Sequence, residues 1–122
     1  MYSARLLDHF ENPRNAGEVA DATLRARVEN PVCGDILELS ARIGEGRIIE
    51  LRFLAKGCVP AMACGSAMAE LVQGRSVSEA RAISKEDVTA AVGGVPKASG
   101  HAAIMAVEAL RKLLVYAQAS QQ

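Results

Sequence analysis

The stretch that decides the fold is DILELSARIGEGRIIELRFLA, residues 35–55, which is typical of two strands joined by a hairpin. Apolar side chains recur at every second position over much of both halves, which is the period of a strand with one buried face. The glycine-rich centre, Gly44–Gly46, is a hairpin signal. The residues expected on the apolar face are Leu37, Leu39, Ala41 and Ile43 in the first strand, and Ile49, Leu51 and Phe53 in the second.

One more strand and one helix are expected on the N-terminal side of this hairpin. The segment ATLRARVEN, residues 22–30, alternates apolar with polar side chains and predicts a strand. Before it, SARLLDHFENP, residues 3–13, spaces its apolar residues as a helix does. Ser3 is its candidate N-cap, and Pro13 ends the segment.

Helices are expected after the hairpin. Pro60 suits the first position of a helix that continues through residues 61–72. Two shorter helices should follow, each opening with a serine and an acidic residue three positions later, the spacing of a capping box. The last helix, residues 101–118, carries one apolar face. The residues on that face are Ile104, Val107, Leu110, Leu113 and Leu114.

The order of these elements is a helix, three strands and then helices. This order predicts the α+β class, with a small three-stranded antiparallel sheet and helices packed on one of its faces. A chain of 122 residues suits one domain, and neither a linker nor an internal repeat divides it. Residues 1–122 are therefore expected to form a single domain.

Composition argues against several classes of partner. Lys plus Arg and Asp plus Glu both total 14, and aromatic residues make up 3% of the chain, so no nucleic-acid partner is expected. The sequence lacks an apolar run long enough to span a membrane, and its N-terminus lacks the apolar core of a signal peptide. These features predict a cytoplasmic protein without a membrane partner, in which cysteines remain reduced.

Four side chains that can bind a metal are expected at the ends of elements. Cys33 and Asp35 lie between the first two strands, Cys58 lies between the third strand and the helix that follows, and His101 begins the last helix. Functional residues are commonly held at such positions by a rigid scaffold. Cys58 precedes a helix N-terminus, whose partial positive charge should favour its thiolate.

The sulfur, oxygen and nitrogen donors of this set suit two kinds of metal site. They can bind Zn²⁺ tetrahedrally, or they can hold a [2Fe–2S] cluster, in which histidine replaces cysteine at some sites. Each residue also has a structural interpretation: a cysteine can fill a tight turn, an aspartate can cap a turn or helix, and a histidine can cap or pack. The spacing alone leaves these alternatives open, since the chain contains no Cys-x-x-Cys pair.

Four motifs resemble the iron–sulfur cluster assembly scaffold family of the IscU, SufU and NifU N-terminal type, with a SufE/NifU-like fold. The opening stretch YSARLLDHFENPRNAGEV resembles the family's first helix and the loop after it, and NPVCGD resembles its first ligand loop. The stretch FLAKGCVPAMACGSAMAELVQG resembles its Gly-Cys loop and the following helix, and GHAAIMAVEALRKLL resembles the start of its last helix. The resemblance extends over nearly the whole chain.

The resemblance implies a scaffold or carrier, not an enzyme. Such a protein receives sulfur from a cysteine desulfurase, gathers iron, and delivers a [2Fe–2S] cluster to apo iron–sulfur acceptor proteins. It implies that the iron or cluster ligands are Cys33, Asp35, Cys58 and His101. Because a carboxylate is a harder ligand than a thiolate, Asp35 should hold iron less firmly and favour release.

The sequence departs from the family pattern at two places. IscU-type members carry His-Cys at the start of the last helix, whereas this chain has His101-Ala102, so the third ligand cysteine is absent. A Leu-Pro-Pro-Val-Lys segment docks a chaperone pair in those members, whereas this chain has GGVPKAS, which puts chaperone docking by that route in doubt.

The missing cysteine leaves alternatives to a cluster scaffold. The chain could instead be a zinc-binding regulatory relative that binds a desulfurase or a scaffold without building clusters, and Zn²⁺ could also occupy the site of a scaffold at rest. Cys64, inside the helix after Cys58, has two interpretations: a core residue or a substitute ligand.

Overall fold

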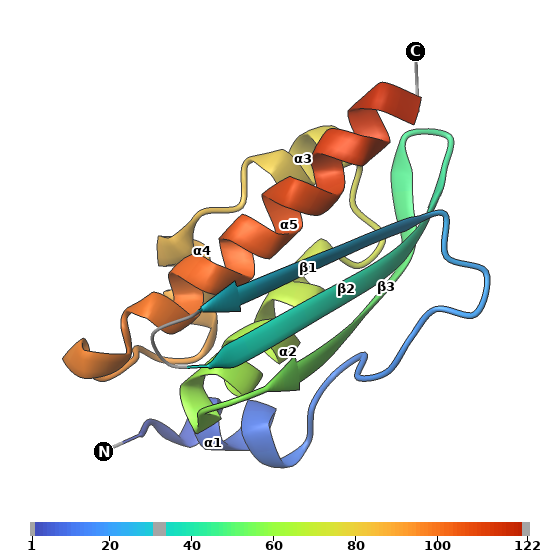
Figure 1. Cartoon of the computed structure of the whole chain (residues 1–122). Helices are drawn as coiled ribbons and strands as arrows, with labels where there is room; N and C mark the ends of the chain where they lie inside the picture. The colour runs from blue at the N-terminus through green and yellow to red at the C-terminus, as the bar shows by residue number, and fades with distance from the viewer. Residues whose placement is uncertain (1, 31–33, 121–122) are drawn as a thin grey trace.

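A computed structural model of the chain describes residues 2–30 and 34–120, with the side chains of 118–120 left aside. It has one three-stranded antiparallel sheet in the order β1-β2-β3, formed by Leu24–Asn30, Asp35–Gly44 and Arg47–Lys56. Figure 1 shows the three strands side by side, with helices on one side of them. The predicted α+β class and the predicted sheet are confirmed.

Helices precede and follow the sheet. Helix α1 spans Ala4–Glu11, and the two longer helices after the sheet are α2, Val59–Val72, and α5, His101–Ser120. The short helices α3, Val77–Arg81, and α4, Lys85–Ala91, connect them and begin with the two predicted capping boxes. A 3-10 turn, η1, spans Lys97–Ser99 just before α5. Every helix in the described ranges is too short or too polar to cross a membrane.

The hairpin turn forms where the glycines predicted it. Strand β2 ends at Gly44 and β3 begins at Arg47, which leaves a two-residue loop. Both loop residues have positive φ, 52° at Glu45 and 74° at Gly46. Two consecutive positive φ values are the geometry that matches the twist of a tight hairpin, and glycine adopts them without strain.

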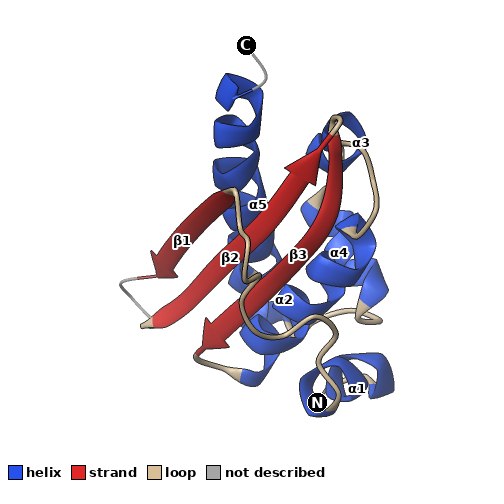
Figure 2. Cartoon of the chain, turned by 90° about the vertical axis from the view of Figure 1, so that its right-hand side faces the viewer, coloured by secondary structure: helices blue, strands red, loops and turns tan. Residues whose placement is uncertain are grey.

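The core lies between the sheet and the α2 and α5 helices (Figure 2). Three of the inward side chains of the strands, Leu37, Leu39 and Phe53, are at most 3% exposed. Along α5 the apolar face contains Leu110, Leu113 and Leu114, each at most 1% exposed. Burial of this continuous apolar surface is the main force that holds the helices on the sheet.

Two expectations about the apolar faces are wrong. Ile49 is 50% exposed, whereas its neighbour Ile48 is fully buried. The register of β2 with β3 shifts between Arg42 and Ile43, and Ile49 is the extra residue on β3. A bulge of this kind breaks the alternation of faces. Ile104 is 40% exposed, because it lies at the edge of the apolar face of α5 rather than within it.

The opposite face of the sheet is crossed by the chain between α1 and β1, which Figure 2 shows in front of the strands. The segment first pairs with the edge of β3, where Ala16 forms a parallel bridge with Phe53 and the backbone N–H of Gly17 donates to the Phe53 carbonyl at 2.9 Å. On the face itself, the backbone N–H of Val19 donates to the Ser40 hydroxyl at 2.9 Å. This crossing segment covers part of the face that the helices leave open. Among the described residues, the helices lie on one face of the sheet, as predicted.

Candidate functional site

Three of the four predicted ligands meet at one end of the sheet. Asp35 is the first residue of β2, Cys58 is the N-cap of α2, and His101 is the first residue of α5. Figure 1 shows the beginnings of these three elements on the same side of the molecule. One carboxylate oxygen, the Cys58 Sγ and one imidazole nitrogen all lie within 4.8 Å of one another. A set of donors this close could surround a single metal ion.

The fourth predicted ligand, Cys33, lies outside the described residues. It precedes Asp35 by two positions in the sequence. Its role as a ligand stays a prediction.

Asp35 is the centre of the site. Its Oδ1 accepts a hydrogen bond from the backbone N–H of Cys58 at 3.2 Å. Its Oδ2 lies 3.4 Å from the Cys58 Sγ and 3.3 Å from the His101 Nε2. The Asp35 side chain is 3% exposed and that of His101 is 31% exposed. The carboxylate is therefore held inside the protein, while the imidazole and the half-buried thiol remain within reach of solvent.

The expectation that the start of α2 makes Cys58 a thiolate is wrong. Burial raises the pKa of the Cys58 thiol, and the Asp35 carboxylate raises it further. The peptide groups at the start of α2 lower the pKa, but their effect is smaller than that of burial. Cys58 is accordingly a thiol that donates to Asp35, and a metal ion that binds it must displace this proton.

Cys64 lies in the core. It is fully buried in α2, and burial raises the pKa of its thiol to about 12. A thiol with these properties behaves as a small apolar side chain. Of the two interpretations that the sequence left open, the structure favours core packing.

Ala102, at the position where the resemblance expects a cysteine, is also buried, with 1% of its surface exposed. The only donor that the described start of α5 brings to the site is His101.

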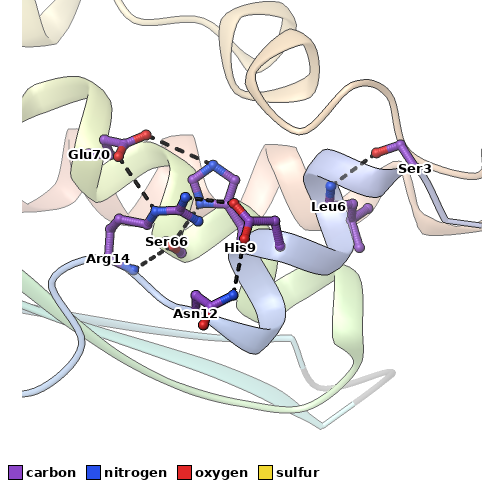
Figure 3. A network of polar contacts seen from close by, with 8 residues as sticks. Ser3, Leu6, His9, Asn12, Arg14, Ser66 and Glu70 are labelled. Carbon is purple, nitrogen blue, oxygen red and sulfur yellow. Dashed lines mark hydrogen bonds and ion pairs between the residues drawn. The ribbon is translucent and has the colours of Figure 1, made fainter.

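A second polar network, shown in Figure 3, joins α1 to α2. The Nδ1 of His9 lies 2.9 Å from the Ser66 Oγ, and the same hydroxyl accepts the backbone N–H of Arg14 at 2.8 Å. The Arg14 side chain forms ion pairs with Asp8 at 2.6 Å and Glu70 at 3.7 Å. Over this stretch the sequence predicted a helix and showed a family motif, but the polar network was not predicted. The available signal was a histidine on the same helical face as buried Leu6, which predicts a buried imidazole in need of a partner.

Comparison with known proteins identifies the family. The model of the NifU-like N-terminal domain matches residues 1–121. The chain belongs to this family. It is 39% identical, over 94% of its length and 75% of the relative's, to the iron–sulfur cluster assembly scaffold protein IscU 1 of Archaeoglobus fulgidus. It is 35% identical to the IscU scaffold protein of Escherichia coli K12, over 90% of this chain and 88% of that one. The resemblance drawn from the sequence is confirmed.

Solved structures share the NifU-like fold. A candidate iron–sulfur cluster assembly scaffold protein for the SUF system of Fervidobacterium islandicum AW-1 superposes with a TM-score of 0.76 at 18% identity, over 93% of this chain and 96% of that one. The N-terminal part of a nitrogen-fixing NifU-like protein from Brucella abortus gives 0.64 at 23% identity, over 90% and 77%. At these identities the likeness concerns the fold alone.

Proposed function

We propose that this chain is a scaffold for iron–sulfur cluster assembly. It receives sulfur through a cysteine desulfurase, binds iron or a [2Fe–2S] cluster as its cargo, and passes that cargo to apo acceptor proteins. It holds and transfers the cargo and does not turn over a small substrate. The observation that carries the proposal is the convergence of Asp35, Cys58 and His101 in a member of the NifU-like family. The names of its relatives as cluster assembly scaffolds support the same function.

The proposed ligands are Cys33, Asp35, Cys58 and His101. Thiolates are the usual ligands of iron–sulfur clusters, and imidazole replaces them at some irons. The chemistry of the three described donors fits such a cargo: one sulfur, one nitrogen and one carboxylate lie close enough to act together. With Cys33 as the second thiolate, the set would have four members.

Asp35 suits a cargo that must leave. A carboxylate oxygen is a harder donor than a thiolate, so its bond to iron in a sulfide cluster is the weakest of the set. The Cys58 thiol and the His101 ring both contact Asp35. When iron leaves, the Asp35 carboxylate would again accept a hydrogen bond from the Cys58 thiol and contact the His101 ring.

The test is anaerobic reconstitution with ferrous iron, cysteine, a cysteine desulfurase and dithiothreitol, which reduces the transferred sulfur to sulfide. Visible absorption and iron, sulfide and zinc analysis follow. Equal amounts of iron and sulfide bound to the parent protein would support the scaffold. We expect Cys58→Ala to abolish cluster binding. Cys64→Ala is the matched control, because it removes the same side chain from the same helix but from the core. It should bind cluster as the parent does.

Two results would contradict the proposal. Bound zinc with no retained sulfide in the parent would favour the zinc-binding regulatory relative, which the alanine at position 102 makes worth testing. Equal cluster binding by Cys58→Ala and the parent would show that the site described here is not the cluster site. Reconstitution of Cys33→Ala, Asp35→Ala and His101→Ala would then test the remaining ligands one at a time.

A further inference from the structure

The turn between β3 and α2 brings the backbone onto the Asp35 carboxylate. Strand β3 ends at Lys56, which pairs with Ile36 of β2. The next pair along the ladder would be Gly57 with Asp35, but the chain turns there with φ of 146° at Gly57. The turn places the Cys58 N–H within hydrogen-bonding distance of Asp35 Oδ1, at 3.2 Å.

The approach is so close that only glycine fits at position 57. A Cβ atom on Gly57 would lie 2.0 Å from the Oδ1 of Asp35, 2.6 Å from its Cγ and 3.0 Å from its Cβ. These separations are far below van der Waals contact. The carboxylate has little room to withdraw, because the Asp35 side chain is 3% exposed and is held by Cys58 and His101.

We propose that Gly57 is a positioning residue for the metal-binding site. The missing side chain leaves the space that the Asp35 carboxylate fills, and so keeps that carboxylate between the Cys58 thiol and the His101 imidazole. A larger residue would push the carboxylate away from both donors. This inference rests on the proposed function only where metal binding is concerned. The contact between Gly57 and Asp35 can be tested without any metal.

Two properties of Gly57 have to be separated in the experiment. A φ of 146° disfavours any other residue through backbone strain, whatever surrounds it. The contact with Asp35 adds a second penalty that disappears when the carboxylate is removed. Gly74 provides a control for a positive φ without a contact, since its φ is 78° and a Cβ atom there would meet nothing within 4 Å.

The experiment is a double-mutant cycle over positions 35 and 57, with Gly57→Ala, Asp35→Ala and the double variant beside Gly74→Ala. Co²⁺ serves as the probe, because its thiolate charge-transfer band reports coordination by cysteine. Titration gives the affinity, and urea unfolding of the metal-free proteins gives the stability. We expect Gly57→Ala to weaken Co²⁺ binding by about 10–100-fold, as loss of a supporting residue at a metal site does. Gly74→Ala should bind as the parent does.

The proposal is tested by whether the effect of Gly57→Ala depends on the Asp35 carboxylate. In the Asp35→Ala background, Gly57→Ala should weaken Co²⁺ binding no further. It should also lower the urea midpoint less than it does in the parent, because the clash is gone. Additive effects on stability, or parental Co²⁺ affinity in a folded Gly57→Ala protein, would overturn the proposal. If Gly57→Ala alone does not fold, refolding of the double variant supports the contact and its failure counts against it.

Failure of the proposed function would look different. If the parent protein bound neither Co²⁺ nor cluster, the proposed metal-binding function would be wrong. The coupling in unfolding between positions 35 and 57 would still decide whether Gly57 positions the carboxylate.

Discussion

The Nδ1 of His9 and the Oγ of Ser66 lie 2.9 Å apart, although 57 positions separate the two residues in the chain. This contact joins α1 to α2, the helix that begins at Cys58. His9 is 6% exposed, and its other ring nitrogen lies 3.9 Å from a carboxylate oxygen of Glu70. Burial lowers the pKa of His9 below its ordinary 6.5, and Arg14 lowers it further, whereas Glu70 opposes both. The imidazole is therefore neutral in the folded protein at neutral pH.

The lowered pKa of His9 predicts a loss of stability in mild acid. The unfolded chain binds the His9 proton more readily than the folded protein does. The contribution of neutral His9 to folding stability is therefore fully present above pH 6.5, and it is lost as the pH falls from there toward the lower pKa of the folded state. One proton gives a slope of at most about 1.4 kcal/mol per pH unit. Urea unfolding at a series of pH values between 5 and 8 measures this slope.

Two variants assign the slope to His9. His9→Gln should flatten the pH dependence in this range, whereas His101→Gln, which removes the only other histidine, should keep the contribution of His9. A parental slope in His9→Gln would contradict the assignment.

Cys58, the N-cap of α2, and Cys64, inside α2, should differ in their rates of alkylation. Cys64 is fully buried with a pKa of about 12, so iodoacetamide at pH 8 should leave it unmodified in the folded protein. Cys58 is half-buried with a raised pKa and should react, but more slowly than it does in denaturant. Peptide mass spectrometry gives both rates, and a Cys33→Ser background leaves these two as the only thiols. Reaction of Cys64 at the rate of Cys58 would mean that α2 is not packed as described.

Neighbouring isoleucines on β3 should differ sharply in their contribution to stability. Ile48→Ala removes a fully buried side chain and should cost about 2–5 kcal/mol. Ile49→Ala alters the exposed bulge residue and should change the unfolding free energy by no more than about 0.5 kcal/mol. Chemical denaturation measures both, and each variant is the control for the other. Similar costs would place the bulge elsewhere.

Ala102→Cys should strengthen cluster retention. The substitution supplies a thiolate directly after His101, where the family resemblance expects one, and thiolates are the preferred ligands of the cluster. The half-life of a reconstituted cluster in the presence of a chelator should lengthen several-fold over that of the parent. Ala103→Cys is the matched control, because Ala103 is buried to a similar extent one position further along α5. Equal lengthening in both variants would attribute the effect to an added thiol rather than to its position.

Most of the fold could be predicted from the sequence, because its signals are local. The alternation in residues 35–55, the glycines of the hairpin and the serines that cap α3 and α4 all act on neighbouring residues. The predictions of buried residues are wrong where a long-range contact overrides the local pattern of apolar residues. The bulge at Ile49 depends on how β3 pairs with β2, and the exposure of Ile104 depends on how α5 rests on its neighbours.

The sequence by itself determined which donors this protein has and that they stand at the ends of elements. Only the tertiary structure decided which side chains these donors contact. His101 contacts Asp35 across 66 positions, a distance that no periodicity encodes. The protonated state of Cys58 follows from its burial beside that carboxylate, which outweighs the helix N-terminus that the sequence made visible. Electrostatic effects of this kind depend on the surrounding dielectric, and a chain acquires that environment only when it folds.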